Sequence, residues 1–134
     1  MKIVEPAHWP KPKGYANGVV TSGPTLFIAG QIGWNLAHEF ESDDLADQFA
    51  ATLDNVLAVV KAAGLEPSSV VKMTIYVTDL PAYRASGKAI GAAWRERFGK
   101  HFPSMALVGV AGLVEPRAKV EIETTCEMDA VIPA

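Results

Sequence analysis

Residues 118–128 read AKVEIETTCEM and alternate strictly in polarity. One set of side chains is apolar or small: Val120, Ile122, Thr124, Cys126 and Met128. The set between them is mostly charged: Lys119, Glu121, Glu123, Thr125 and Glu127. Because successive side chains of a β-strand point to opposite faces, this pattern predicts a strand with one face in a core and one face outside it.

Three other parts of the chain are predicted to join this strand in a sheet. Residues 71–78 (VKMTIYVT) show the same alternation and predict a half-buried strand. Residues 105–113 are apolar almost throughout, which favours a strand buried on both faces. Residues 18–21 and 25–29 are short apolar runs around Ser22-Gly23-Pro24, a pattern that predicts a β-hairpin.

Two segments have the pattern of helices. Apolar residues recur at helical spacing through residues 45–63, after a possible N-cap in Ser42-Asp43-Asp44 and before a stop at Gly64. A second helix is predicted over residues 81–98, with proline in its first turn and Gly99 as its stop. Its interior is weakened by two glycines, Gly87 and Gly91.

The order ββαβαββ predicts one α+β domain spanning residues 1–134, with two helices on one face of a mixed sheet. Residues 1–14 contain three prolines and are expected to form an extended N-terminal arm. Two helices cover only one sheet face. The other face therefore needs cover, which favours association with further copies of the chain.

Composition argues against several classes of function. The formal net charge of -3 lacks the positive field that nucleic-acid binding requires. No apolar stretch is long enough to span a bilayer, and the N-terminus has no signal-peptide pattern. The single cysteine, Cys126, excludes an internal disulfide and suits a reducing compartment. We therefore expect a cytoplasmic protein that binds neither nucleic acid nor membrane.

General catalytic motifs are absent from the sequence. It contains no glycine-rich phosphate loop, no nucleophile elbow and no histidine pair with metal-ligand spacing. Cys126 lies on the apolar face of its strand and is interpreted as a small core residue. Glu121 and Glu123 share the opposite face. By pattern they form a solvated charged face, whereas a neighbouring subunit that covered them would leave a carboxylate able to move protons.

Several segments together, in order and at matching spacing, resemble the RidA/YjgF family of reactive-intermediate deaminases. The resemblance runs from residue 14 to residue 128. The segments that carry it are GYANG (14–18), FIAGQI (27–32), LDNV (53–56), AAG (62–64), VKMTIYVTD (71–79), FPSMALVGVAGL (102–113) and AKVEIE (118–123).

This resemblance implies a chorismate-mutase-like fold and a homotrimer with a cleft at each subunit interface. Enzymes of the family hydrolyse imines or enamines to a carbonyl compound and ammonia, and they need no cofactor or metal. The resemblance assigns the proton-transferring carboxylate to Glu121 and an aromatic wall to Tyr15. It also implies that Ala29, Gly30, Gln31 and Val108 line the small-molecule site.

One departure from the family pattern bears on the substrate. Members that deaminate small imino acids have an arginine in the C-terminal signature, and Met105 stands at that place. A thioether cannot bind a carboxylate, so activity on small iminopropionate-type substrates is doubtful. Met105 is interpreted either as a core filler or as the wall of a site for a larger substrate. Four candidate replacement cations are Lys72, Lys88, Arg117 and Lys119.

Trp34 is a second unusual residue, and the sequence leaves its role open between stacking on an unsaturated ligand and packing against a helix. The favoured function is hydrolytic deamination of a small or conjugated enamine or imine, with 2-aminomuconate as one type of substrate. The alternative is a non-catalytic trimer that binds a small molecule or a protein. A ribonuclease is the weakest hypothesis, because the chain is acidic and has no basic stripe.

Overall fold

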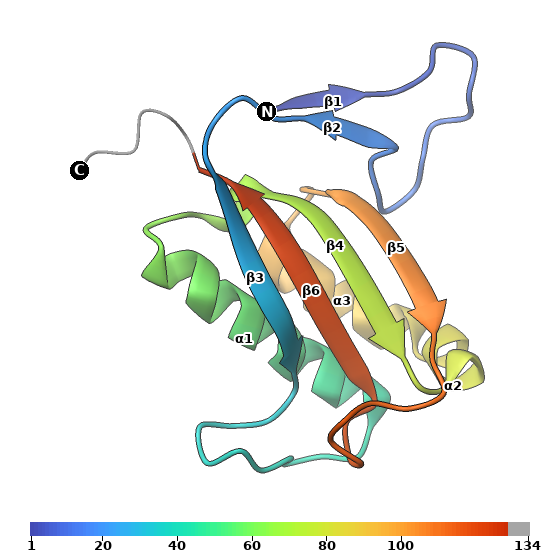
Figure 1. The fold of residues 1–134 in the computed structure, drawn as a ribbon. Coiled ribbons are helices and arrows are strands. Elements are labelled where there is room, and N and C mark those ends of the chain that lie inside the picture. Colours follow the sequence, from blue (N-terminus) through green and yellow to red (C-terminus); the bar gives the residue numbers. More distant parts are fainter. Residues whose placement is uncertain (129–134) are drawn as a thin grey trace.

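A four-stranded mixed sheet forms the body of the structure, a computed structural model that describes residues 1–128 (Figure 1). The strand order is β3 (Thr25–Ile32), β6 (Val120–Glu127), β4 (Val70–Val77) and β5 (Ser104–Gly109). β4 and β5 are parallel, whereas β6 is antiparallel to both of its neighbours. The sheet is therefore mixed, as the sequence predicts.

Three helices pack on one face of this sheet and leave the other face open toward the viewer of Figure 1. They are α1 (Leu45–Ala62), α2 (Leu80–Ala85) and α3 (Gly87–Phe98), and a short 3₁₀ turn, η1 (Pro67–Ser69), precedes β4. The α+β class is confirmed. The prediction of two helices is wrong by one, because the second helical segment breaks at Ser86 directly before Gly87.

Helix α1 begins and ends where its sequence predicts. The Asp44 side chain accepts a hydrogen bond from the backbone N–H of Asp47, which caps the first turn. Gly64 follows the C-cap with a φ of 76°, a conformation that glycine adopts without strain. The apolar stripe of the helix is buried against the sheet: Leu45, Phe49, Leu53, Val56 and Val60.

Strand β6 lies at the centre of the core. As its polarity alternation predicts, one face of the strand is in the core and the other lies outside it. Val120, Ile122, Thr124 and Cys126 are all buried on the helix-covered side. Val120, Ile122 and Cys126 pack in one cluster with the stripe of α1, with β4 and with apolar residues of α3. Burying this much apolar surface is what holds the helices on the sheet.

The predicted hairpin of residues 18–21 and 25–29 is wrong. β2 (Gly18–Val20) pairs instead with β1 (Lys2–Val4), and the two form a separate antiparallel ribbon that stands off the end of the main sheet (Figure 1). Residues 1–14 are therefore more than an extended arm. β1 pairs with β2 through backbone hydrogen bonds. Between β2 and β3, the Glu127 carboxylate accepts hydrogen bonds from the backbone N–H groups of Ser22 and Gly23.

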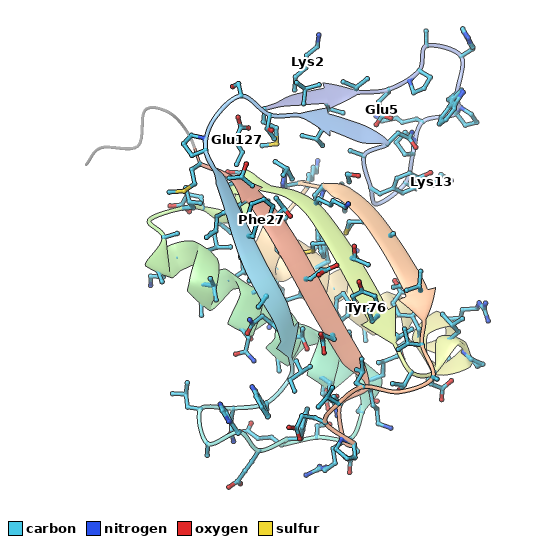
Figure 2. The ribbon with its side chains drawn as sticks, viewed as in Figure 1. Lys2, Glu5, Lys13, Phe27, Tyr76 and Glu127 are labelled. Carbon is cyan, nitrogen blue, oxygen red and sulfur yellow. The ribbon has the colours of Figure 1, made fainter. Side chains whose placement is uncertain are left out.

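The prediction of burial on both faces for residues 105–113 is also wrong for the single chain. β5 ends at Gly109 and is an edge strand, so its open-face residues Ala106 and Val108 are exposed. At the other edge, Phe27 of β3 is 79% exposed on the same open face (Figure 2). No helix in residues 1–128 has both the length and the apolar character needed to cross a membrane.

Candidate functional site

The strand register places three side chains in one row across the open face of the sheet. Glu121 of β6 is the pairing partner of Tyr76 of β4, which in turn pairs with Val108 of β5. Paired residues on adjacent strands project from the same face. Two of the sequence-predicted site residues, Glu121 and Val108, therefore lie on one face with Tyr76 between them.

Gly30 lies against the Glu121 carboxylate. A Cβ at Gly30 would overlap Oε2 of Glu121 and would lie 2.8 Å from its Cδ. An irregularity in the β3–β6 register between Ile28 and Gln31 brings the strand this close. Ala29 is exposed beside it, and the Gln31 side-chain amide donates to the Ala29 carbonyl. The strand end that the sequence assigns to the site is thus next to the assigned carboxylate.

Tyr76 is a member of this surface that the sequence analysis did not select (Figure 2). Its hydroxyl donates a 2.9 Å hydrogen bond to Oε1 of Glu123. This hydrogen bond, together with the nearby charges of Glu123 and Glu121, raises the pKa of Tyr76 above its ordinary value of 10.0. The polarity alternation of β4 places Tyr76 on the outer face. Its position beside Glu121, however, follows from a register that the sequence does not contain.

Met105 lies on the opposite side of the sheet from Glu121. It pairs with Met73, which is fully buried, and it packs against the core on the helix side. There it borders a cavity of about 360 Å³. Tyr15 is 42% exposed, and its neighbour Ala16 is bridged to Ser104 at the start of β5. Tyr15 and Met105 therefore belong to the β5 edge.

The predicted site residues consequently form two groups. Glu121, Ala29, Gly30 and Gln31 lie toward the β3 edge, and Tyr15, Met105 and Val108 lie at the β5 edge. Two strands, β6 and β4, separate these edges within one chain. Adjacent strands are about 4.8 Å apart, so a small molecule cannot contact both groups of the same chain without lying along the sheet face.

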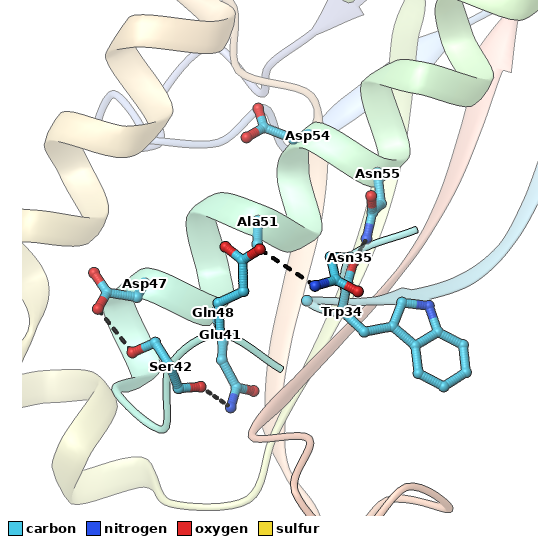
Figure 3. A pocket seen from close by; sticks show the side chains of 10 residues that line it. Trp34, Asn35, Glu41, Ser42, Asp47, Gln48, Ala51, Asp54 and Asn55 are labelled. Carbon is cyan, nitrogen blue, oxygen red and sulfur yellow. Dashed lines mark hydrogen bonds between the residues drawn. The ribbon is translucent and has the colours of Figure 1, made fainter. Parts of the chain in front are cut away.

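Trp34 follows β3 and borders a separate pocket of about 470 Å³ between the loop of residues 33–42 and α1 (Figure 3). Its indole stacks on the His38 ring, with 3.9 Å between the ring centroids and 3° between the planes. The acidic groups of this pocket already have partners, since Asp47 accepts from Ser42 and Glu41 accepts from Asn35. The structure therefore groups Trp34 with His38 and not with Glu121.

The structure of residues 1–128 also bears on the cysteine and on possible metal-binding clusters. Burial raises the pKa of the Cys126 thiol, and the side chain lies inside the core, so the interpretation as a small core residue is confirmed. Within residues 1–128, no three acidic, histidine or cysteine side chains are grouped closely enough to hold a metal ion.

The class of the molecule follows from these features: a mixed sheet with helices on one face, and a carboxylate on the other beside a glycine of the edge strand. A family model described as endoribonuclease L-PSP matches residues 7–128, and the chain belongs to this family, which is the RidA/YjgF family.

The relatives of the chain agree in extent and fold. It is 33% identical over 124 residues to a 2-iminobutanoate/2-iminopropanoate deaminase of Dermatophagoides farinae, covering 92% of this chain and 93% of that protein. It is 36% identical over 112 residues to the protein of that name in Escherichia coli (strain K12), covering 81% and 83%.

Solved structures give the same result. The Rid-family protein YyfB of Yersinia pestis superposes with a TM-score of 0.82 at 31% identity, over 95% of this chain and 98% of that one. Escherichia coli TdcF with bound serine superposes with a TM-score of 0.68 at 32% identity, over 96% of this chain and 100% of that one. The fold predicted from the resemblance is therefore confirmed.

Proposed function

We propose that this protein hydrolyses an imine, or the enamine that tautomerises to it, to a carbonyl compound and ammonia. The observation that carries the proposal is the Glu121 carboxylate, held against Gly30 on the open sheet face beside Tyr76. Deaminases among the relatives support the reaction class. A carboxylate next to exposed backbone can hold a water molecule and exchange a proton with it.

In this mechanism Glu121 takes a proton from water while the oxygen attacks the carbon of the protonated imine, C=NH2+. The electron pair of the C=N double bond moves to the nitrogen, which gives the neutral carbinolamine. Glu121 then gives its proton to that nitrogen, the C–N bond breaks, and ammonia leaves as the hydroxyl proton passes to Glu121 and the carbonyl forms. The ammonia takes this last proton and leaves as ammonium. One water molecule is consumed, and no electrons are exchanged with a cofactor.

We further propose that the active form is a homotrimer and that its sites lie between subunits. The exposed open face, with Phe27 at one edge and Val108 at the other, supports this assembly, since apolar patches of this kind mark interfaces. A neighbouring copy would bring its β3-edge group toward the β5-edge group of the first chain. Both groups of site residues would then line one cleft.

The test of the catalytic role is ammonia release by the variant Glu121→Gln, assayed on imino acids generated in situ and on 2-aminomuconate. We expect at least about a 100-fold loss of turnover, the usual contribution of a general acid–base group. The matched control is Glu123→Gln, two residues along the same face, which should keep most of the activity. Undiminished turnover by Glu121→Gln would refute the mechanism.

The alternative function is binding without catalysis. It predicts that the folded wild-type protein releases no ammonia from any member of the substrate panel and yet binds carbonyl or carboxylate compounds. The position of Glu121 beside Gly30 favours catalysis, because a carboxylate next to exposed backbone can hold and activate a water molecule. If the wild-type protein releases no ammonia from any substrate of the panel, the function is binding without catalysis.

A further inference from the structure

The cavity behind β5 has the size and lining of a small-molecule site. Its volume of about 360 Å³ lies within the range of about 300–1,000 Å³ that is usual for ligand pockets. Its inner wall is apolar and largely buried: Phe49, Ile75, Ile90, Trp94, Phe102 and Met105. Gly14, Gly87 and Arg95 are exposed and form its solvent side.

Arg95 is the charged residue among those that line this cavity. Its guanidinium lies back along α3 over Gly91. A Cβ placed at Gly91 would be only 3.3 Å from Nη1 of Arg95. Within residues 1–128 the ion pairs involve the N-terminus, Arg97 and Arg117, so Arg95 has no acidic partner there. A cation without a partner at the rim of an apolar cavity is suited to bind an anionic group.

One costly feature of α3 has a consistent explanation in this cavity. Gly91 lies inside the helix, where glycine is less favourable than alanine by about 1 kcal/mol, and Gly87 is the first residue of the helix. They are spaced four residues apart in line with Arg95, so the three residues share one face of the helix. The missing side chain at 91 lets the guanidinium lie against the helix, and the space at Gly87 stays open, since a Cβ there would meet no atom within 4 Å.

Met105 lines the cavity at the position where a positive charge is missing. It stands where the sequence resemblance implies a carboxylate-binding arginine, and it lines the same cavity as Arg95. Met105 is uncharged, whereas Arg95 brings a planar, permanently charged guanidinium to the solvent side of the same cavity. The four cations considered from the sequence do not line this cavity. One of them, Arg117, is already bonded to Asp43.

We propose that Arg95 binds the carboxylate of the substrate and that the cavity holds an apolar or aromatic side chain attached to it. The substrate class is then a 2-imino acid larger than iminopropanoate or iminobutanoate, and the product is the matching 2-oxo acid with ammonia. The reaction assigned to this substrate rests on the proposed deaminase function, whereas the binding of the carboxylate by Arg95 does not depend on it. It makes Arg95 a residue that determines specificity.

Direct binding tests the proposal on the full-length protein. The probes are 3-phenylpropanoate and its neutral amide, 3-phenylpropanamide, each titrated by calorimetry into the wild type, Arg95→Gln and Arg84→Gln. Arg84 is an exposed arginine of α2 that does not line the cavity, so its variant controls for the lost charge. We expect Arg95→Gln to weaken 3-phenylpropanoate about 10-fold or more and to leave the amide within about two-fold.

The outcomes separate the two proposals. Equal weakening of both probes, an unchanged affinity for the carboxylate, or no binding to the wild type would overturn the role of Arg95. If binding depends on Arg95 but no imine is deaminated, the carboxylate site stands and the proposed reaction fails. If imines are deaminated and Arg95→Gln has unchanged affinity and turnover, the reaction stands and the carboxylate site fails.

Discussion

At Gly30, the absence of a side chain leaves room for the Glu121 carboxylate. We therefore predict that Gly30→Ala displaces this carboxylate and lowers deaminase turnover by at least about 10-fold, because a misplacement near 1 Å costs a catalytic group much of its effect. The backbone at Gly30 does not have a positive φ, so alanine is not strained there by its own conformation. Steady-state ammonia release and circular dichroism measure activity and folding together.

The matched control is Gly112→Ala. A Cβ at Gly112 meets no atom within 4 Å, and this glycine is also free of positive φ. The variant should therefore keep both its fold and its turnover. If Gly30→Ala retains full activity with its fold intact, the contact between Gly30 and Glu121 has no part in positioning the carboxylate.

The sequence predicts the position of a side chain correctly where the polarity pattern of its own strand determines it. Alternation placed Glu121 on the outer face and Cys126 in the core, and the structure has both in those positions. Arg95 and Tyr76 were missed for a common reason. Their relevance depends on which residues of other elements lie beside them, and that neighbourhood is created by strand register and helix packing.

Among the elements, one carboxylate stabilises the joint between the β1–β2 ribbon and the sheet, alongside the bridge from Ala16 to Ser104. Glu127 accepts the backbone N–H groups of Ser22 and Gly23, and its Oε2 lies 3.0 Å from the N-terminal ammonium (Figure 2). The Ser22 hydrogen bond, followed by the ammonium, lowers the pKa of Glu127 from 4.5 to about 2. The ionised form is thus the one that the folded protein stabilises.

The pH dependence of stability follows from this direction. The folded protein has the lower pKa, so the contribution of Glu127 is complete above its unfolded pKa of 4.5 and is lost as the pH falls toward 2. We predict that Glu127→Gln destabilises the protein at pH 6 and that its difference from the wild type shrinks steadily below pH 4.5. Urea unfolding at a series of pH values measures this difference.

The exposed Glu66 offers a control, since its side chain makes no capping hydrogen bond to the turn that follows it. Glu66→Gln should differ little from the wild type at any of these pH values. A constant difference between Glu127→Gln and the wild type from pH 6 to pH 2 would mean that the charge of Glu127 does not hold the joint.

The elements themselves were predicted unevenly. The bounds of α1 follow from local sequence signals: a side-chain cap at Asp44, one apolar stripe and a glycine after its end. Local sequence does not determine which strand pairs with β2. Short apolar runs on both sides of Ser22-Gly23-Pro24 fit a hairpin equally well, and the choice of β1 as partner depends on contacts about 16 residues away in sequence.

On the scale of the whole molecule, the proposed site residues are divided between the two faces of the sheet. Arg95 lies behind β5, on the helix side of the sheet, whereas Glu121 lies on the open face of β6. The sheet itself separates them. A substrate carboxylate held by Arg95 of one subunit could therefore reach only the Glu121 carboxylate of another subunit.

This separation predicts complementation between two impaired proteins. Glu121→Gln is expected to be nearly inactive alone, and Arg95→Gln, assayed at substrate concentrations well below the wild-type KM, to keep about a tenth of the activity or less. When equal amounts are unfolded together and refolded, a cleft is intact if one subunit brings Arg95 and the next brings Glu121. With random assembly this holds for about one cleft in four, so we expect about a quarter of the wild-type turnover per site.

The control for complementation is separate refolding of each variant, followed by mixing under conditions where subunits do not exchange. That mixture should stay as inactive as its components. Recovery of activity only after joint refolding would place the two groups on different subunits of one site. If joint refolding gives no recovery and the mixed oligomers are present, both groups must act from the same chain, and the proposed path from the Arg95 cavity to a neighbour's Glu121 would be wrong.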